Sequence, residues 1–265
     1  MTTLGVIFPP DLPPERLRTV ALAADQAGLE QLWLWEDCFK ESGIATATAV
    51  LAWTEQLTVG IGLLPVPLRN VALTAMELAT MERLFPGRLV AGVGHGVSEW
   101  MEQVGAGVGS PMTLLREYTS ALRALLAGET VTCAGRYVQL HDVALDWPPA
   151  EPPPLLVGAV RERTMALAGE LGDGAILTGE TTVAALRDAV PQLAAGRARS
   201  GRAGDADVVV FAAIAGPPEA TAMASRVQDL TAAGATHVIL LSVGDGPDLE
   251  DFVRLVARDV RALVD

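Results

Sequence analysis

The segment ALTAMELATMERLFPGRLVAGVGHG (72–96) carries the main signals of the fold in one stretch. In residues 72–85 the apolar residues recur at spacings of three and four, which predicts an amphipathic helix. Gly87 stands where that helix should end, because glycine readily takes the left-handed conformation that terminates helices. The run RLVAGV (88–93) is apolar at successive positions, as expected of a parallel strand covered on both faces. The stretch therefore predicts a helix that is followed by a buried strand.

The same alternation continues along the whole chain. Further strands are expected at 4–8, 31–35, 57–62, 154–159, 173–178, 207–214 and 237–242. Glycines at positions where a helix should stop with a positive φ precede three of them: Gly28, Gly172 and Gly234. Eight strands, each followed by a helical pattern, fit an α/β fold of the (β/α)8 TIM-barrel type, for which about 250 residues is typical. An open doubly wound sheet is the alternative, because periodicity does not reveal closure.

Two segments interrupt the alternation. The proline-rich DWPPAEPPP (146–154) is incompatible with a helix or a central strand. It is interpreted as an extended crossing between two halves of one domain, so that residues 1–265 form a single domain. The segment GETVTCAGRYVQLHDV (128–143) alternates around AGR, which indicates a hairpin. We expect this short insertion to lie over the barrel mouth, where loops usually carry specificity.

Composition narrows the possible partners. The formal net charge is −13, Lys40 is the single lysine and no basic stretch occurs, so binding of nucleic acid is not expected. Cys38 and Cys133 form no CxxC and the histidines lack metal-ligand spacing, which argues against a disulfide framework or a metal site. No apolar run reaches the roughly 18 residues of a membrane span, and no signal-peptide pattern is found. We expect a cytoplasmic protein that acts on small molecules.

In a barrel, the residues that follow the carboxyl ends of the strands build the site. One such stretch is GVGHGVSEW (92–100). It is not a dinucleotide fingerprint, because GxGxxG would need a glycine where Val97 stands. His95 has the chemistry to exchange a proton near neutral pH, and Glu99 is a second candidate acid. A tight strand-to-helix turn with a structural histidine is the alternative interpretation.

A second stretch, EDCF (36–39), follows the strand at 31–35. In a barrel one of its two carboxylates, Glu36 or Asp37, should point into the mouth, although solvated carboxylates are the plain alternative. Cys38 has no basic neighbour to lower the pKa of its thiol, so a nucleophilic cysteine is not expected.

Two further stretches indicate binding of an anion and a constrained backbone. VRERT (160–164) opens a helix, and free backbone N–H groups together with Arg161 and Arg163 form an anion site, unless the arginines are merely exposed. TGETT (178–182), one strand later, offers hydroxyl donors to the same anion. GLLPVPLRN (62–70), with two prolines and a glycine, indicates either a forced backbone shape or a plain loop.

Taken in order, these stretches resemble the luciferase-like monooxygenase superfamily over about residues 4–243. The resemblance is carried by WLWEDCF, GIGLLPVPLRNVALTAMELATMERLFPGRLVAGVGHG, SPMTLLREYTSALRALLAGE, LLVGAVRERTMALAGELGDGAIL and ATHVILL. The chain is most similar to the actinobacterial branch that uses the deazaflavin coenzyme F420. The resemblance implies a (β/α)8 barrel with an insertion at its mouth, often a homodimer, which binds a flavin or deazaflavin in that mouth.

The resemblance also implies which positions hold the cofactor. The ring would lie against the end of the third strand, where a non-prolyl cis peptide forms a bulge at about Ile61 to Leu63, which includes Gly62. Gly94 and Gly96 would let the backbone approach the cofactor. The cofactor phosphate would lie on the loop and helix start formed by Gly158, Ala159, Val160, Arg161, Arg163 and Thr164, with Thr178 and Gly179 beside them.

The chain departs from the family at two places. Many deazaflavin-dependent members have an Asp-His pair where this chain has Glu36 and Asp37. The general-acid glutamate of the related sugar-phosphate dehydrogenases falls at Val97, so that activity is not expected.

The resemblance therefore predicts an oxidoreductase that transfers a hydride between coenzyme F420 and a small organic substrate. Asp37, His95 and Glu99 are the candidate acids. Trp33, Trp35 and Trp100 are expected either to wall the pocket or to lie in the core. An FMN-dependent monooxygenase that uses oxygen and a non-catalytic flavin-binding barrel are the alternatives, and the substrate and the direction of reaction stay open.

Overall fold

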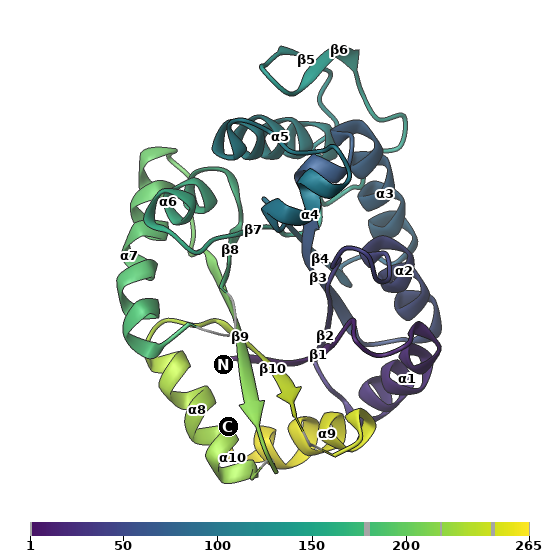
Figure 1. Cartoon of the computed structure of the whole chain (residues 1–265), viewed down its shortest axis with the longest axis vertical. Helices are drawn as coiled ribbons and strands as arrows, with labels where there is room; N and C mark the ends of the chain where they lie inside the picture. Colours follow the sequence, from purple (N-terminus) through teal and green to yellow (C-terminus); the bar gives the residue numbers. More distant parts are fainter. Residues whose placement is uncertain (1, 178–180, 218, 245–246, 265) are drawn as a thin grey trace.

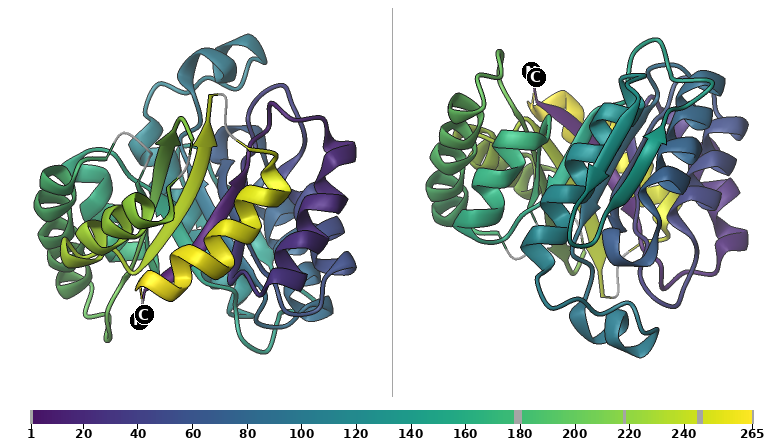
Figure 2. Two further views of the ribbon diagram at one scale, coloured as in Figure 1. Left: turned by 90° about the horizontal axis from the view of Figure 1, so that it is seen from below. Right: turned by 90° about the horizontal axis from the view of Figure 1, so that it is seen from above.

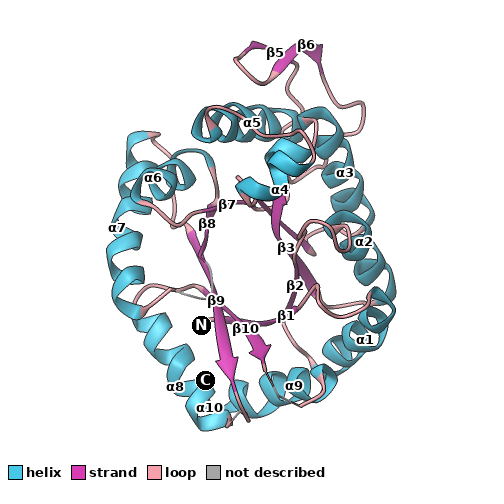
Figure 3. Ribbon diagram, viewed as in Figure 1, coloured by secondary structure: helices cyan, strands magenta, loops and turns pink. Residues whose placement is uncertain are grey.

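A computed structural model describes residues 2–177, 181–217, 219–244 and 247–264. Its main sheet is a closed parallel barrel with the strand order β1-β10-β9-β8-β7-β4-β3-β2 (Figures 1 and 3). The barrel strands are β1 (Thr3–Phe8), β2 (Gln31–Leu34), β3 (Thr58–Pro65), β4 (Leu89–Gly94), β7 (Leu155–Gly158), β8 (Gly174–Leu177), β9 (Asp207–Ala215) and β10 (His237–Val243). Each apolar run of the sequence supplies one strand, so the (β/α)8 prediction is confirmed and the open sheet is wrong.

The helices form an outer ring around the barrel, except the fourth in chain order, which lies over the barrel mouth (Figure 1). They are α1 (Leu17–Ala27), α2 (Gly43–Trp53), α3 (Val71–Leu84), α4 (Ser98–Gln103), α5 (Pro111–Leu126), α6 (Glu162–Leu171), α7 (Val183–Arg199), α8 (Ala220–Ala232), α9 (Leu249–Leu255) and α10 (Arg261–Val264). Short turns of other helix types are η1 (Pro14–Arg16), η2 (Val66–Leu68) and η3 (Val256–Val260). Figure 2 shows both chain ends together at the end of the barrel opposite α4, where Arg261 donates to the Thr2 carbonyl at 2.9 Å.

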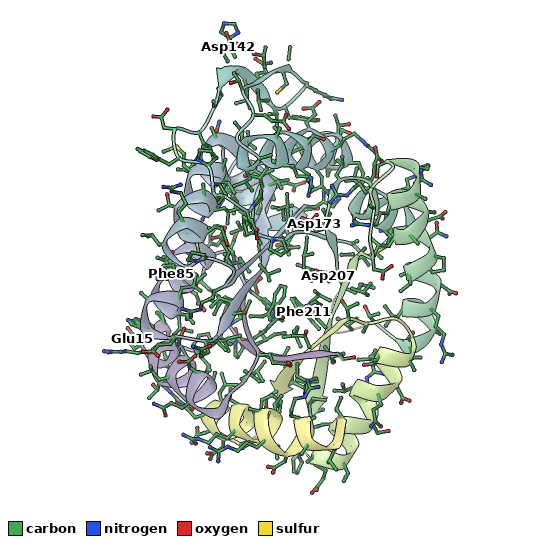
Figure 4. All side chains as sticks on the ribbon, turned by 180° about the vertical axis from the view of Figure 1, so that it is seen from behind. Glu15, Phe85, Asp142, Asp173, Asp207 and Phe211 are labelled. Carbon is green, nitrogen blue, oxygen red and sulfur yellow. The ribbon has the colours of Figure 1, made fainter. Side chains whose placement is uncertain are left out.

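Successive strand residues point alternately into the barrel and toward the helices, which explains why the strands are apolar at nearly every position. One set of side chains fills the barrel interior: Ile7, Trp33, Val90, Leu156, Ile176, Val209, Phe211 and Ile239. The other set packs under the helices and forms a larger, continuous core. Figure 4 shows the Phe211 side chain within the barrel.

Three of the four glycines expected to end helices behave as predicted. Gly28, Gly87 and Gly234 have φ values of 76°, 71° and 109°. Gly172 does not, since its φ is −92°. A Cβ there would lie 2.8 Å from the Ala168 carbonyl oxygen, so this glycine is required for space and not for a left-handed turn.

The hairpin predicted at 128–143 is present as β5 (Val131–Ala134) and β6 (Gln139–Val143). Its predicted place over the mouth is wrong, because it lies on the outer side of α5 (Figure 1). There Glu117 of α5 accepts hydrogen bonds from the backbone N–H groups of Arg136, Tyr137 and Val138 at 2.8–3.0 Å. The segment that extends beyond the strand ends at the mouth is α4 with its flanking loops (Figure 2).

Candidate cofactor site

The end of β3 has the irregular backbone that the family resemblance implied. The Gly62–Leu63 peptide is cis, and the register between β3 and β4 shifts between Ile61 and Leu64. The Leu63 side chain turns toward the ends of β4 and β7. A Cβ on Gly94 would lie 2.6 Å from the Leu63 side chain, and one on Gly158 would lie 2.2 Å from it. These two glycines therefore make room for Leu63, a reason that sequence reasoning missed.

A cavity of about 790 Å³ opens beside this bulge, between the segment after β4 and the start of α6. It brings together many of the residues predicted from the sequence: His95, Gly96, Gly158, Val160, Arg161, Arg163 and Thr164. Its lining does not include the other predicted residues, namely Asp37, Gly62, Leu63, Gly94, Glu99 and Ala159. Thr178 and Gly179 lie outside the described residues.

The α6 end of the cavity has the character of an anion site. Arg161 is the residue that precedes the first turn of α6, and no side chain caps the helix there. Arg161 and Arg163 are exposed and form no ion pair within the described ranges. Glu162 also lines the cavity and partly offsets their charge. The buried Thr164 hydroxyl contacts the Met112 sulfur at 3.7 Å.

His95 lies on the opposite wall of the cavity and is half-buried. Burial lowers the pKa of its imidazole from 6.5, which favours the neutral form of the ring. Its Nδ1 is buried and has no hydrogen-bond partner among the described residues. A buried polar atom without a partner costs free energy, so this nitrogen favours a polar group in the cavity.

The two carboxylates after β2 have different environments. Glu36 accepts hydrogen bonds from Arg69 at 2.9 and 3.1 Å and from the Gly43 N–H at 2.9 Å, so it is a structural residue. The Asp37 carboxylate is half-buried and accepts no hydrogen bond within the part of the chain that is described. Burial raises the pKa of Asp37, although nearby Lys40 lowers it in part. Of these two residues, Asp37 is therefore the one whose carboxylate is available at the mouth.

Glu99 lies on the exposed side of α4 and does not line the cavity. Glu102, one helical turn later, lines it instead. Sequence reasoning missed Glu102, although the helical spacing within α4 would have placed the two glutamates near one another.

The tryptophans divide between core and mouth. Trp33 is fully buried inside the barrel, where its Nε1 donates to Gln31 at 2.9 Å. Trp35 is half-buried at the mouth and stacks on Phe211 with a centroid distance of 5.8 Å. Its Nε1 is buried without a partner among the described residues. Trp100 does not line the cavity. Phe211 was not predicted, although its position two residues after Val209 on an alternating strand would have pointed it inward.

In the described ranges, no group of three or more His, Cys, Asp or Glu side chains is arranged to hold a metal ion. Within the same ranges, no helix combines the length and the apolar character needed to cross a membrane.

Comparison with known sequences finds relatives among F420-dependent enzymes. The chain is 27% identical over 249 residues to the 5,10-methylenetetrahydromethanopterin reductase of Methanolobus tindarius, which covers 92% of this chain and 76% of the relative. It is 32% identical over 197 residues to an F420-dependent glucose-6-phosphate dehydrogenase of Kineococcus radiotolerans, which covers 66% of this chain and 58% of that relative.

Comparison with solved structures supports the barrel. An F420-dependent secondary alcohol dehydrogenase in complex with an F420-acetone adduct matches with a TM-score of 0.89 at 17% identity, covering 100% of this chain and 99% of the other. The coenzyme F420 dependent tetrahydromethanopterin reductase of Methanopyrus kandleri matches with a TM-score of 0.87 at 18% identity and the same coverage. The family model described as luciferase-like monooxygenase matches residues 2–255. Because that match spans nearly the whole sequence, the chain belongs to the luciferase-like monooxygenase family.

Proposed function

We propose that this chain is an F420-dependent oxidoreductase that transfers a hydride between coenzyme F420 and a small organic substrate. One observation carries the proposal. The cavity reaches from Gly158, which touches the Leu63 bulge, to the two unpaired arginines at the start of α6. A flat ring with an anionic side chain fits such a shape. The relatives and structural neighbours that are named as F420-dependent support this cofactor over FMN.

The residues present fit a deazaflavin. The half-buried Leu63, which lies against Gly158 of the cavity lining, would offer an apolar surface for the ring. Arg161, Arg163 and the first N–H groups of α6 would hold the phosphate of its side chain. The unpartnered Nδ1 of His95 would accept or donate a hydrogen bond within the cavity. When bound, the coenzyme supplies the hydride chemistry.

The protein's own task is to position the ring, exclude water and exchange a proton. Asp37 and His95 are the residues suited to the proton, because burial holds both closer to the neutral form. Asp37 with its raised pKa is more readily protonated than an ordinary aspartate, and neutral His95 is able to accept a proton. Glu99, exposed outside the cavity, is the weakest of the candidate acids.

The first test is a fluorescence titration of the purified protein with coenzyme F420 and with FMN. We expect F420 to bind more tightly than FMN. The double variant Arg161→Gln/Arg163→Gln should weaken F420 binding about 10- to 100-fold, because charge-assisted hydrogen bonds contribute roughly 1.5–3 kcal/mol each and exposure reduces that value. Arg187→Gln, an exposed arginine of α7, is the matched control and should bind F420 normally.

Three other outcomes would contradict the proposal. Unchanged F420 binding by the double variant would remove the anion site from α6. Preference for FMN would indicate a monooxygenase that uses oxygen. Binding of neither cofactor would indicate a barrel without this activity.

We also propose that residues 1–265 form one domain and that the protein is a cytoplasmic homodimer. An exposed apolar surface supports the dimer: Leu73, Met76 and Leu84 of α3 with Trp147, which we name the α3 face. A hollow of about 440 Å³ lies between Met76, Leu84 and Trp147 on this face, and side chains of a second copy would fit into it. The actinobacterial origin stays a prediction.

A further inference from the structure

The floor of the barrel mouth is apolar. Trp35 of the loop after β2 and Leu241 of β10 pack on the interior cluster beside Phe211. By alternation, Ala213 is the next inward-facing residue of β9, and it is exposed. Across the barrel, the half-buried Leu63 continues the same surface.

The two sides of the barrel mouth differ in their charged groups. The unpaired arginines, Arg161 and Arg163, lie at the start of α6, after β7. On the side of β1, β2 and β3, Arg18 of α1 lies over the Trp53 ring at 5.7 Å, and three other cations are paired with carboxylates. Lys40 is paired with Asp11, Arg69 with Glu36 and Glu77, and Arg16 with Glu250.

On the side of β1, β2 and β3, the charged groups that face a substrate are carboxylates. Asp37 and Glu41 both lie there, half-buried. An anionic substrate placed over Trp35 would therefore meet like charge, and Lys40, Arg69 and Arg16 are already engaged by other carboxylates. Burial of an unpaired charge is costly, so such a substrate would bind weakly.

The rim adds apolar surface. Phe39, Val97 and Val160 follow β2, β4 and β7, and their exposed fractions are 64%, 45% and 78%. Single exposed apolar residues are ordinary, but three around one opening are typical of a site that receives an apolar molecule.

We propose that the substrate is an uncharged, largely apolar molecule that lies on Trp35 and Phe211, and that carboxylated or phosphorylated substrates are rejected. This inference rests on the proposed function, because it assigns the α6 arginines to the anionic part of the coenzyme and leaves the opposite half of the mouth to the substrate. The buried Trp35 Nε1, which has no partner among the described residues, would donate to one polar atom of that molecule.

The test compares two probes that share one skeleton: methyl naphthyl ketone, and the same ketone with a carboxylate on its second ring. Binding of each is measured by equilibrium dialysis against the full chain saturated with oxidised F420. We expect the neutral ketone to bind saturably and at least about tenfold more tightly than the carboxylate. Equal or tighter binding of the carboxylate, or no saturable binding of either probe, would overturn the substrate class.

A variant tests whether the preference for the neutral ketone arises at the barrel mouth. Ala213→Lys adds an ammonium group at an exposed inward-facing position, so binding of the carboxylated ketone should tighten about tenfold and binding of the neutral ketone should not. Leu263→Lys makes the same charge change on the exposed surface of α10 and should alter neither. If the two variants behave alike, the substrate does not lie on this floor.

The F420 titration keeps the two proposals separable. A chain that binds F420 but favours the carboxylated ketone contradicts the substrate class alone. A chain that binds no F420 contradicts the proposed function, whichever ketone it favours.

Discussion

His95 and Asp37 differ in charge when ionised, yet burial acts on both in the same way. It disfavours the charged form of each side chain, so the pKa of His95 falls and the pKa of Asp37 rises. Both groups are thereby moved toward the uncharged state in an apolar mouth. The two residues are therefore suited to exchange a proton with a neutral substrate.

The His95 shift can be measured directly. We expect its imidazole to titrate with a midpoint below 6.5, because its burial opposes protonation in the folded state. Since the unfolded chain binds that proton more readily, this residue reduces stability as the pH falls through 6.5. An NMR titration of the histidine ring signals gives the midpoint, and His95→Gln identifies the signal. A midpoint at or above 6.5 would contradict the burial seen here.

Asp25 is a residue whose charge stabilises the fold. Burial alone would raise its pKa. However, its carboxylate accepts hydrogen bonds at 2.9–3.0 Å from the backbone N–H groups of Glu55, Gln56 and Leu57. These bonds and the nearby charge of Arg88 lower the pKa below 3.8. We expect Asp25→Asn to reduce the free energy of unfolding at pH 7 by about 1 kcal/mol, a value kept low by solvent screening.

The pH dependence of that loss follows from the sign of the shift. A lowered pKa in the folded state gives stability that is present above 3.8 and disappears as the pH falls through the folded value. The difference between wild type and Asp25→Asn in urea unfolding should therefore shrink below pH 3.8. Asp188→Asn, an exposed carboxylate of α7, serves as the control and should be neutral. An Asp25→Asn protein as stable as wild type at pH 7 would refute the assignment.

Among the helices, α6 and α7 form the closest contact, and two glycines permit it. A Cβ on Gly169 of α6 would lie 2.0 Å from the Leu193 carbonyl oxygen, and one on Gly196 of α7 would lie 2.0 Å from that of Ala166. The helices therefore approach backbone to backbone, which fixes the position of α6 and of the anion site at its start.

A Gly196→Ala variant tests this packing. Replacing glycine by alanine inside a helix normally raises stability by about 1 kcal/mol. Here we expect a loss of about 1–3 kcal/mol, because the added methyl group overlaps the backbone of α6. Urea denaturation measures it, and Ala195→Gly on the exposed side of α7 gives the propensity effect alone. A stabilised Gly196→Ala protein would show that the helices lie further apart.

At the scale of helices and strands, most of the barrel could be predicted from the sequence, but parts of the site could not. Apolar runs such as 88–93 identified the strands because parallel strands are buried on both faces. The hairpin at 128–143 was predicted but misplaced, since local alternation does not show where a hairpin packs, and the Glu117 hydrogen bonds that hold it come from a distant helix. Gly94 and Gly158 were assigned to the cofactor, but the side chain that requires them, Leu63, comes from another strand.

At the scale of the whole molecule, the α3 face is the surface that we expect a second copy to cover. Met76 at its centre is 58% exposed, so a charge there would be desolvated on association. Wild-type protein should sediment as a dimer, and Met76→Glu as a folded monomer, in sedimentation velocity experiments. Leu263→Glu introduces the same charge at a comparably exposed apolar residue and should remain dimeric. A monomeric wild type, or a dimeric Met76→Glu, would exclude this interface.

The barrel is closed by pairing between β1 and β10, in which Thr3 lies opposite His237. Translation makes one of these strands first and the other more than two hundred residues later. At roughly 5–20 residues per second, β1 waits on the order of 10 to 50 seconds for its partner. During that interval its edge has unpaired N–H and C=O groups, which readily capture strands of other nascent chains. The yield of soluble protein should therefore fall as the density of ribosomes on the messenger RNA rises, and it should increase when chaperones shield the nascent chain.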